Sequence, residues 1–430
     1  MRGSRRCAPS RGRAWRAPRR SPSGTRPCSQ GRCDSMTRRR HAFTLVELLI
    51  AATLSGLVLL GVFFVFTSNT RQYYTQEQIL QMQESMRFAT EYLKTDLRNS
   101  GQMAIVNGDD TNRNGPTDDV DGLYCRVAGR PGFRGVRMVD NDGAAPAILR
   151  ANRNGLRPDR VEIMTDATGG TPLRGTLGGT TVTMVPGAQQ FSHAARQVLA
   201  SEGVFETQYR VGHFLRVSKP SSKQFDLVAI SGVNYGGGIP TVTLAEVPCV
   251  SGGELLVNAV QFVRYRIATD PPGDVNAVKT NLVREVLNAR DLGATVLDDS
   301  TLTVAEFVVN LQIWGTYEYR LGAIASIPAD ADPTDDIGNW PAANEEGTRL
   351  NETPHRLRAL NVLLATRSPR EDPQLALAPD IAIAAEARIP ADRSWFDVVD
   401  ETPDQVTEYA RVLTLTTTVE TPNLRTEANK

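Results

Sequence analysis

Histidine and cysteine are scarce in this chain, which contains four His and five Cys among 430 residues. The composition excludes disulfide-scaffold and collagen-like classes. The sequence also lacks an HExxH pair, a P-loop, a dinucleotide-binding glycine fingerprint after a strand, and a G-x-S-x-G turn. His193, His213 and His355 are scattered along the chain. We therefore expect a protein that is not an enzyme. The hydrophobic content of 40% predicts folded domains rather than wholesale disorder.

Opposite charges are segregated along the chain, although the formal net charge is zero, with 48 basic and 48 acidic residues. Residues 1–42 contain thirteen Arg, no Lys and a single acid, Asp34, which gives +12. Residues 43–430 therefore keep 35 bases against 47 acids and carry −12. The zero sum argues against a globally basic nucleic-acid binder, so we expect no nucleic-acid partner.

Residues 1–35 are rich in Arg, Pro, Ser and Gly and have almost no apolar periodicity. Such a segment cannot bury enough surface to offset the entropy of ordering it. Two interpretations stay open: a basic disordered arm that binds an anionic surface, or upstream sequence translated from a start codon set too early. Residues 36–42 already form a compact basic leader that begins with Met36, and this favours the second interpretation.

One apolar run is long enough to cross a membrane. Residues 43–66, FTLVELLIAATLSGLVLLGVFFVF, contain no proline and one ionisable group, Glu47. As a helix this run spans about 36 Å, against ~30 Å of hydrocarbon. Arginines 38–40 precede the run and the next base is Arg71, so the positive-inside rule predicts a cytoplasmic N-terminus and an external C-terminal domain. A carboxylate in such a segment costs at least ~2.5 kcal/mol and indicates a specific partner.

The string RRHAFTLVELLIA, residues 39–51, resembles the class III signal of type IV prepilins and pseudopilins. The resemblance implies that a prepilin peptidase of the inner membrane cuts between Ala42 and Phe43, and that Phe43 is then N-methylated. The family usually has Gly where this chain has Ala42. The resemblance also implies that Glu47 pairs with the ammonium of Phe43 in a neighbouring subunit during assembly. This agrees with the cost of leaving either charge alone in lipid.

The helix is predicted to continue through residues 67–100, because apolar residues recur at spacings of three and four. They are Ile79, Met82, Met86, Ala89, Leu93 and Leu97. On the solvated side we expect Arg87 to pair with Glu84 and Glu91. Ser100-Gly101 is the expected end of the helix.

The stretch MRFATEYLKTDLRNSGQ, residues 86–102, resembles the end of the long helix in PilW-type minor pilins. The pattern of those proteins has Arg, Leu, Asp, Arg and Gly at fixed spacing, and it is matched by Arg87, Leu93, Asp96, Arg98 and Gly101. Weaker likeness continues in residues 159–163, 260–265 and 416–425.

Residues 101–430 change to short β-branched runs separated by Gly, Pro, Asn and Asp, which predicts an extracytoplasmic β-rich domain with long loops. The expected fold class is α+β and pilin-like, with the long N-terminal helix packed on a mostly antiparallel sheet. Residues 329–354 and 368–403 are the expected long loops. The predicted strands are Arg160–Met164, Thr180–Val185, Phe225–Ser231, Thr241–Val247, Ala259–Ile267, Ala305–Trp314, Leu357–Ala365 and Val412–Val419. Gly236-Gly237-Gly238 is interpreted as a turn.

Two features of this domain suggest stabilising chemistry. Cys125 and Cys249 are the cysteines that remain after leader removal, and outside the cytoplasm they could form a disulfide. The acidic segment 110–121 has EF-hand-like spacing, with Gly115 at the sixth position. It makes calcium the expected cation, although a solvated Asp/Asn/Gly turn needs no metal. Its candidate ligands are Asp110, Asn112, Asn114, Pro116 through its carbonyl, Asp118 and Asp121.

Three functions fit these observations. The first is a minor pilin that is processed by prepilin peptidase and assembles with other minor and major pilins, starting from the inner membrane. The second is a minor pseudopilin of a type II secretion system, which would share the N-terminal signal. The third is a membrane-anchored, calcium-dependent adhesin or binding protein that stays uncut.

Overall fold

The computed structural model describes residues 44–100, 135–139, 142–150, 156–220, 225–250, 252–274, 277–291, 293–320, 323–326, 357–370, 395–397 and 409–421. The chain divides into two compact units, residues 1–68 and 69–430. The boundary between them falls within the first helix, α1 (Leu45–Asn99).

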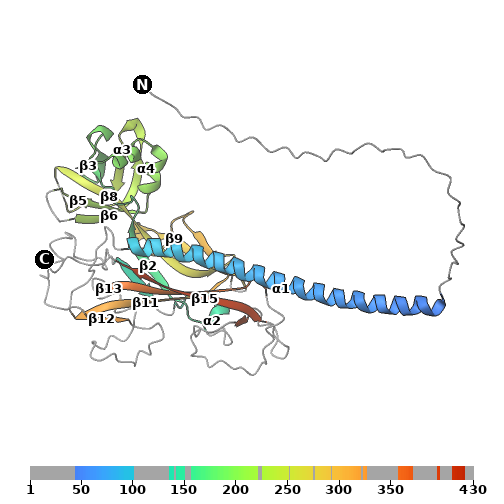
Figure 1. Cartoon of the computed structure of the whole chain (residues 1–430). Helices are drawn as coiled ribbons and strands as arrows, with labels where there is room; N and C mark the ends of the chain where they lie inside the picture. Colours follow the sequence, from blue (N-terminus) through green and yellow to red (C-terminus); the bar gives the residue numbers. More distant parts are fainter. Residues whose placement is uncertain are drawn as a thin grey trace, which may run out of the picture. The chain divides into compact units, whose positions relative to one another are not determined.

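The first unit contains the N-terminal part of α1, the long blue helix in Figure 1. No proline interrupts this part, and Thr44 precedes its first turn. The large apolar side chains from Leu45 to Phe66 are exposed, with 77% of Leu45 and 66% of Phe66 accessible. The hydroxyls of Thr53 and Ser55 donate to the carbonyls of Ile50 and Ala52 at 2.9 and 3.0 Å. These polar groups are therefore satisfied within the helix, as a lipid environment requires.

In the second unit, the C-terminal part of α1 buries one stripe of side chains. Met82, Met86, Ala89, Leu93 and Leu97 are buried, as their spacing predicts, and Thr90 is buried with them. Ile79 is half-buried. The helix ends at Asn99, and the Ser100 hydroxyl donates to the Leu97 carbonyl at 2.6 Å.

The expected ion pairs of Arg87 are wrong. Glu91 instead pairs with Lys94, at 3.1 Å. Side chains three or four residues apart on a helix can both form ion pairs, so the spacing alone does not decide whether Glu91 pairs with Arg87 or with Lys94.

The first sheet of the second unit is antiparallel and follows the order β1-β2-β8-β9-β10. Short helices α2 (Ala147–Arg150) and η3 (Ala289–Asp291) lie in its connections. Its strands are β1 (Val136–Val139), β2 (Arg160–Asp166), β8 (Glu254–Thr269), β9 (Thr280–Leu287) and β10 (Leu302–Glu306).

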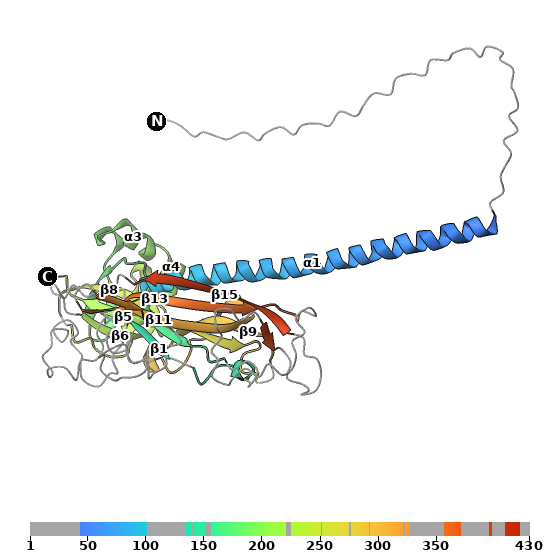
Figure 2. The ribbon, with the colours of Figure 1, turned by 60° about the horizontal axis from the view of Figure 1, so that its bottom comes forward.

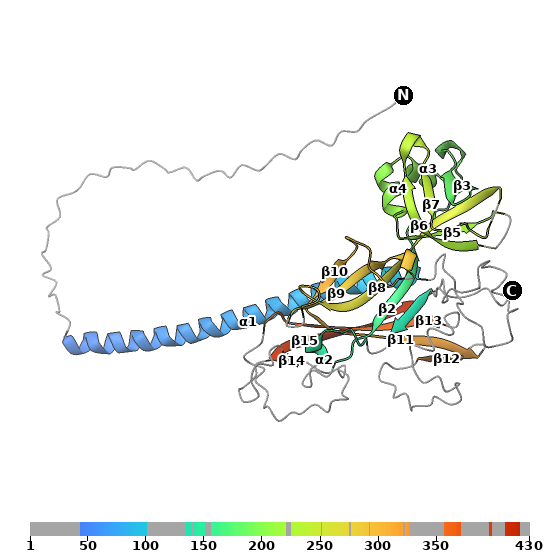
Figure 3. The same cartoon turned by 180° about the vertical axis from the view of Figure 1, so that it is seen from behind.

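A closed barrel forms where β8 continues beyond β2. The first half of β8 pairs with β3 on one side and with β5 on the other, and the ring closes through β4, β7 and β6. Figure 3 shows these strands and the two short helices next to them. The elements are β3 (Leu173–Gly178), β4 (Thr181–Met184), η1 (Gly187–Gln189), α3 (His193–Leu199), α4 (Glu202–Gln208), β5 (Phe214–Ser218), β6 (Phe225–Asn234), η2 (Gly236–Gly238) and β7 (Thr241–Leu244).

The second sheet has the order β12-β11-β13-β15-β14, and Figure 2 shows β11, β13 and β15 side by side. Its described strands are β11 (Val308–Arg320), β12 (Ala323–Ser326), β13 (Leu357–Arg367), β14 (Trp395–Asp397) and β15 (Tyr409–Glu420). All pairings described in it are antiparallel.

Three apolar cores organise the second unit. The largest combines the α1 stripe with strands of both sheets, including Val263, Leu311 and Leu360. A second fills the barrel and includes Phe205 of α4, whose ring stacks on Tyr209 at 4.7 Å between centroids. A third contains Phe214, Phe262 and other residues of β2, β5, β6, β8 and β9. A long apolar helix followed by a mostly antiparallel β-domain confirms the expected α+β, pilin-like fold.

The predicted strands correspond to β2, β4, β6, β7, β8, β11, β13 and β15. The prediction Ala305–Trp314 is wrong in one respect, because Phe307, with φ of 55°, separates β10 from β11, which belong to different sheets. The expected loop 368–403 is also wrong in part, because β14 lies within it. The other expected loop, residues 329–354, lies outside the described residues.

Candidate functional site

The first candidate site is the N-terminal turn of α1, where Glu47 lies. The Glu47 carboxylate accepts hydrogen bonds from the Thr44 backbone N–H at 3.0 Å and from the Thr44 hydroxyl at 3.1 Å. In return, the Glu47 N–H donates to the Thr44 hydroxyl at 3.2 Å. This is a capping box, in which residues three positions apart satisfy each other's orphan donors. Glu47 therefore sits at the start of an exposed apolar helix and is itself exposed.

The described helix is long and apolar enough to cross a membrane, with no part of its most apolar window buried inside the protein. The single carboxylate in this span is the group that a neighbouring cation would have to neutralise in lipid. The two residues of the predicted cleavage site, Ala42 and Phe43, lie outside the described residues. The cut, the methylation and the Glu47 charge pair stay predictions.

The second candidate site is the anchor of α1 to the first sheet, formed by Asp96, Tyr265 and Arg284. Asp96 lies near the end of α1, Tyr265 on β8 and Arg284 on β9. The Asp96 carboxylate accepts from the Tyr265 hydroxyl at 2.6 Å and from Arg284 Nε at 2.8 Å. Only 16% of the Asp96 side chain and 12% of the Arg284 side chain are exposed. A charge-assisted pair with this little water contact fixes the helix in rotation and in register.

The anchor changes the acidity of its own groups. Burial raises the pKa of the Tyr265 hydroxyl well above its usual range, and the neighbouring Asp96 carboxylate raises it further. Burial alone would lower the pKa of Arg284, but the Asp96 charge and hydrogen bond outweigh burial and the pKa of Arg284 is raised. The Tyr265 hydroxyl and the Arg284 guanidinium therefore both keep their protons at any physiological pH and stay donors to the Asp96 carboxylate.

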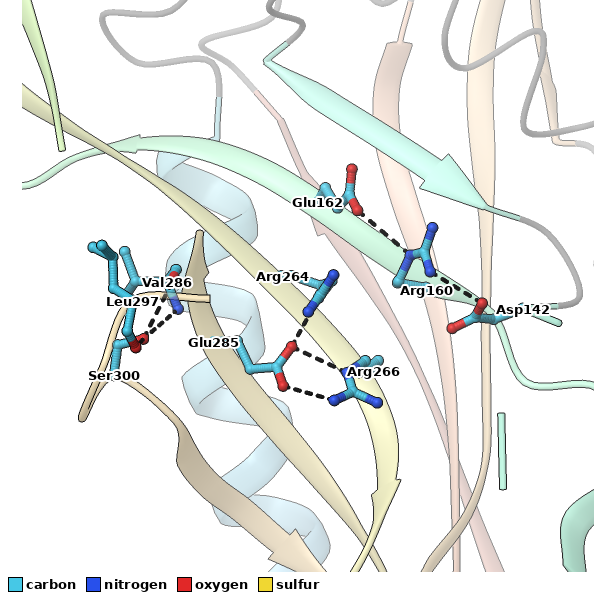
Figure 4. A network of polar contacts seen from close by, with 9 residues as sticks. All are labelled: Asp142, Arg160, Glu162, Arg264, Arg266, Glu285, Val286, Leu297 and Ser300. Atoms are coloured by element: carbon cyan, nitrogen blue, oxygen red, sulfur yellow. Dashed lines mark hydrogen bonds and ion pairs between the residues drawn. The ribbon is translucent and has the colours of Figure 1, made fainter. Parts of the chain in front are cut away.

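A ladder of alternating charges crosses the first sheet, one residue on each of four neighbouring strands. Arg137, Glu162, Arg264 and Glu285 are successive cross-strand partners on β1, β2, β8 and β9. Because side chains alternate across a strand, these residues point away from the face that carries Val161, Ile163, Val263 and Tyr265 in the core with α1. Figure 4 shows part of the ladder with its supporting residues.

Glu285 is the most completely paired carboxylate of the ladder. Arg264 Nε donates to it at 2.7 Å, and Arg266 donates through Nε at 3.0 Å and Nη2 at 2.8 Å. Burial would raise its pKa, but the hydrogen bonds and charges of Arg266 and Arg264 outweigh burial, and the pKa of Glu285 is lowered.

Glu162 has a comparable arrangement on the other side of the ladder. Arg137 Nη1 lies 3.2 Å from its Oε2, and Arg160 Nε lies 3.4 Å from its Oε1. Arg160 also reaches Asp142 at 3.1 Å, which ties the segment before α2 to β2. The ladder contains no nucleophile, and its carboxylates are paired with arginines of the same or neighbouring strands, so its arrangement fits a role in holding strands together.

The predicted calcium loop lies outside the described residues, with all of its candidate ligands, Asp110, Asn112, Asn114, Pro116, Asp118 and Asp121. Among the residues that the structure does describe, no group of three or more His, Cys, Asp or Glu side chains could hold a metal ion. Calcium at residues 110–121 stays a prediction.

Cys249 lies between β7 and β8 and is disulfide-bonded. Its backbone N–H donates to Asp226 Oδ2 at 2.8 Å, which holds this segment against β6. Cys125 lies outside the described residues, as does the partner of this bond. The Cys125–Cys249 pairing therefore stays a prediction.

Sequence reasoning did not identify Tyr265 and Arg284 as the partners of Asp96. Asp96 itself was marked by the helix-end pattern, and Tyr265 fell in a weakly similar segment. The available signal was a polar group on the apolar face of a strand, as in Tyr265 between Val263 and Ile267. Such an interruption predicts a buried polar partner, but it does not say which one.

Comparisons with known proteins add one finding. The family model of the prokaryotic N-terminal methylation motif matches residues 37–63. This range covers the predicted cleavage site, Glu47 and most of the apolar run. No curated protein and no solved structure matches the chain. The match supports a type IV pilin-like or pseudopilin protein with a single-pass inner-membrane anchor, and it implies processing by prepilin peptidase and assembly with other pilins.

Proposed function

We propose that this chain is a minor pilin of a type IV pilus, of the PilW type, that contributes to the initiation of pilus assembly. The observation that carries the proposal is the methylation motif on a helix that continues, without a break, into an amphipathic segment seated on a β-domain. One half of such a helix suits lipid or a filament core. The other half packs on the β-domain, which would be the folded outer domain of the assembled subunit.

The assembly role is non-catalytic in this proposal. After cleavage between Ala42 and Phe43, the new ammonium lies four residues before Glu47. In lipid, the most favourable partner for Glu47 is a cation, and the ammonium of Phe43 in an adjacent subunit supplies one. The N-terminus is then cytoplasmic before assembly, in agreement with the arginines at 38–40. Asp96, which matches the PilW-type pattern, would keep the helix in its seat during extraction from the membrane.

The proposal is tested by the mass of the N-terminal peptide of the protein extracted from membranes. We expect an N-methylated Phe43 terminus in cells that contain prepilin peptidase, and an uncut terminus in cells that lack it. An uncut terminus at Met36 or Met1 in peptidase-containing cells would refute the proposal and favour a membrane-anchored binding protein.

A minor pseudopilin of a type II secretion system would give the same mass. Cross-linking in intact membranes distinguishes the two, because the proposed protein should be recovered with pilus subunits. Recovery with secretion-system components alone would replace the pilus role with the secretion role and leave the processing unaffected.

A further inference from the structure

The barrel is an insertion with its own core. Residues 167–253 connect β2 and β8, which are direct neighbours in the first sheet. Among the described residues, the core that seats α1 contains none from this insertion, whereas the barrel core is built from it and from the first half of β8. The barrel is therefore not needed to hold the helix, and its surface is the place to look for a second role.

A cavity of about 230 Å³ opens on the barrel surface between η1, α3 and the turn that joins β6 to β7. It is lined by Val185, Pro186, Gly187, Arg196, Leu199, Ala200, Gly238 and Pro240, and is called the Arg196 pocket below. Figure 1 shows α3 close to the barrel strands. Sites for drug-sized ligands measure roughly 300–1,000 Å³, so the Arg196 pocket is better matched to a single amino-acid side chain.

The backbone polar groups around the Arg196 pocket are largely occupied. The Val185 carbonyl accepts from Gln190 Nε2 at 2.8 Å, and the Pro186 carbonyl accepts from the Gln189 N–H at 2.8 Å. The Leu199 carbonyl accepts from the Tyr235 hydroxyl. A ligand would therefore find few free backbone acceptors, and would contact polar surface as well as aliphatic and proline side chains.

Arg196 is the charged residue of this lining, and its side chain has few hydrogen-bond partners. Its Nη2 reaches the Gln190 carbonyl at 3.5 Å, the outer limit of a hydrogen bond, and no carboxylate of the described residues lies within ion-pair distance. Arg174, on the neighbouring strand β3, is by contrast paired with Glu254. The exposed Arg196 side chain thus has donors that no carboxylate of the described residues uses, beside a cavity with a mixed polar and aliphatic lining, and an anion is the complementary partner there.

Two exposed apolar residues are close in the sequence to residues of the Arg196 pocket. Ile239 is 42% exposed and stands between the lining residues Gly238 and Pro240. Phe191 is 63% exposed and follows Gln190, whose carbonyl meets Arg196. The Phe191 ring is held in place by the Arg174 guanidinium, 4.4 Å from its centroid. Arginine and aromatic residues are enriched in protein-binding hot spots.

We propose that the Arg196 pocket binds an extended peptide segment of a partner protein, in which an aliphatic side chain stands next to a carboxylate. The aliphatic side chain fills the cavity between Pro186, Leu199 and Pro240. The carboxylate pairs with Arg196, and the neighbouring residues of the segment cover Ile239 and Phe191. The site does not depend on whether the chain belongs to a pilus or to a secretion system.

The test uses the full chain in detergent micelles and fluorescein-labelled hexapeptides, with binding measured by fluorescence anisotropy. The probe is Gly-Ser-Leu-Asp-Ser-Gly, blocked at both ends. A neutral twin has Asn in place of Asp, and a second twin has Gly in place of Leu. We expect the Leu-Asp probe to bind saturably and each twin to bind about tenfold more weakly, as loss of one charged hydrogen bond or one buried aliphatic side chain implies.

Three variants locate the binding. Arg196→Gln should bind the Asp and Asn peptides equally. Ala200→Leu, which adds a branched side chain at the exposed end of α3, should fill the cavity and weaken all three peptides. Arg290→Gln removes an exposed arginine from η3, outside the pocket, and should bind like the original chain. Absence of binding by the Leu-Asp probe, equal binding of its Asn twin, or full binding by Ala200→Leu would overturn the proposal.

Discussion

Replacement of Asp96 is the sharpest test of how the helix is held on the β-domain. Asp96→Ala leaves the Arg284 guanidinium and the Tyr265 hydroxyl without the acceptor that both now use. Breaking a buried ion pair by removing one partner typically costs roughly 3–5 kcal/mol. Because both charged side chains of this pair keep a little water contact, we expect a loss of about 3 kcal/mol in the free energy of unfolding.

Two variants of the same helix serve as controls. Glu91→Ala also removes one acidic side chain from α1, but Glu91 is exposed and pairs with Lys94 on the surface, so about 0.5 kcal/mol or less should be lost. Asp96→Asn keeps the shape and an acceptor oxygen but loses the charge, and its effect should lie between the two. In the double variant Asp96→Ala with Arg284→Met, part of the loss should be recovered because no unpaired charge remains.

Urea unfolding of the full chain in micelles gives the free energies, and hydrogen exchange locates the change. In Asp96→Ala, the amides of residues 86–99 should lose protection before those of β13 and β15, because the anchor joins the helix to the first sheet. Equal losses for Asp96→Ala and Glu91→Ala would refute the reasoning, as would an unaltered exchange rate in residues 86–99.

Three further predictions concern other parts of the chain. His213 is buried, its Nδ1 contacts the Gln208 carbonyl at 3.0 Å, and burial lowers its pKa to about 4. The unfolded chain therefore binds the proton more readily than the folded one, and stability should fall by about 3 kcal/mol as pH drops from about 6.5 to about 4. His213→Asn should flatten this slope in urea titrations at several pH values, and an unchanged slope would assign it to another group. Glu47→Leu and Glu47→Gln should both stay in the membrane yet fail to enter pili on immunoblots of sheared filaments. The Gln variant keeps the capping box with Thr44, so normal incorporation of Gln would show that the charge is dispensable. Calorimetry with calcium should show binding to the chain and none to Asp110→Ala; equal heats for both would remove residues 110–121 as the site.

The helix was predictable because its periodicity is long and its context is simple. Met82, Met86, Ala89, Leu93 and Leu97 repeat over several turns, and each is buried as expected. A pattern of this length outweighs individual propensities. The ion pairs on its surface were not predictable, because Glu91 has basic neighbours at both i−4 and i+3 and the difference between them is small.

Two of the strands that the sequence did not reveal, β9 and β3, have polar groups on both faces or weak β formers. In β9, Arg284 faces the α1 anchor and Glu285 faces the charge ladder, so the strand shows no apolar alternation at its centre. In β3, LRGTLG combines two glycines with a short length. Gly175 has no room for a side chain, since an added Cβ would lie 2.9 Å from Val182 Cγ1. Closure of the barrel depends on pairing between strands far apart in the chain, which local patterns do not encode.

The residues that meet in the candidate sites are also far apart in the chain, so local sequence patterns did not reveal their contacts. Asp96 could be marked from its place in a helix-end pattern, but Tyr265 and Arg284 are 169 and 188 residues away. The Arg196 pocket is assembled from two separate connections of the barrel, the one from β4 to β5 and the turn from β6 to β7, and the turn 236–238 was recognised only as a turn. Pairings of this kind are fixed by topology rather than by local sequence.

The sixteen-residue strand β8 belongs to the barrel in its first half and to the first sheet in its second half, so the barrel is an insertion that joins the sheet at one place. Asp166 at the end of β2 and Val260 within β8 are cross-strand partners, and the Ala167 N–H donates to the Ala259 carbonyl at 2.9 Å. Chain ends this close can be joined by a two-residue hairpin turn without disturbing the strands that follow. Recombination at this point could therefore replace or diversify residues 168–258 while the core that seats α1 is inherited, provided that the incoming segment covers Phe262 and Leu287 as Phe214 does now.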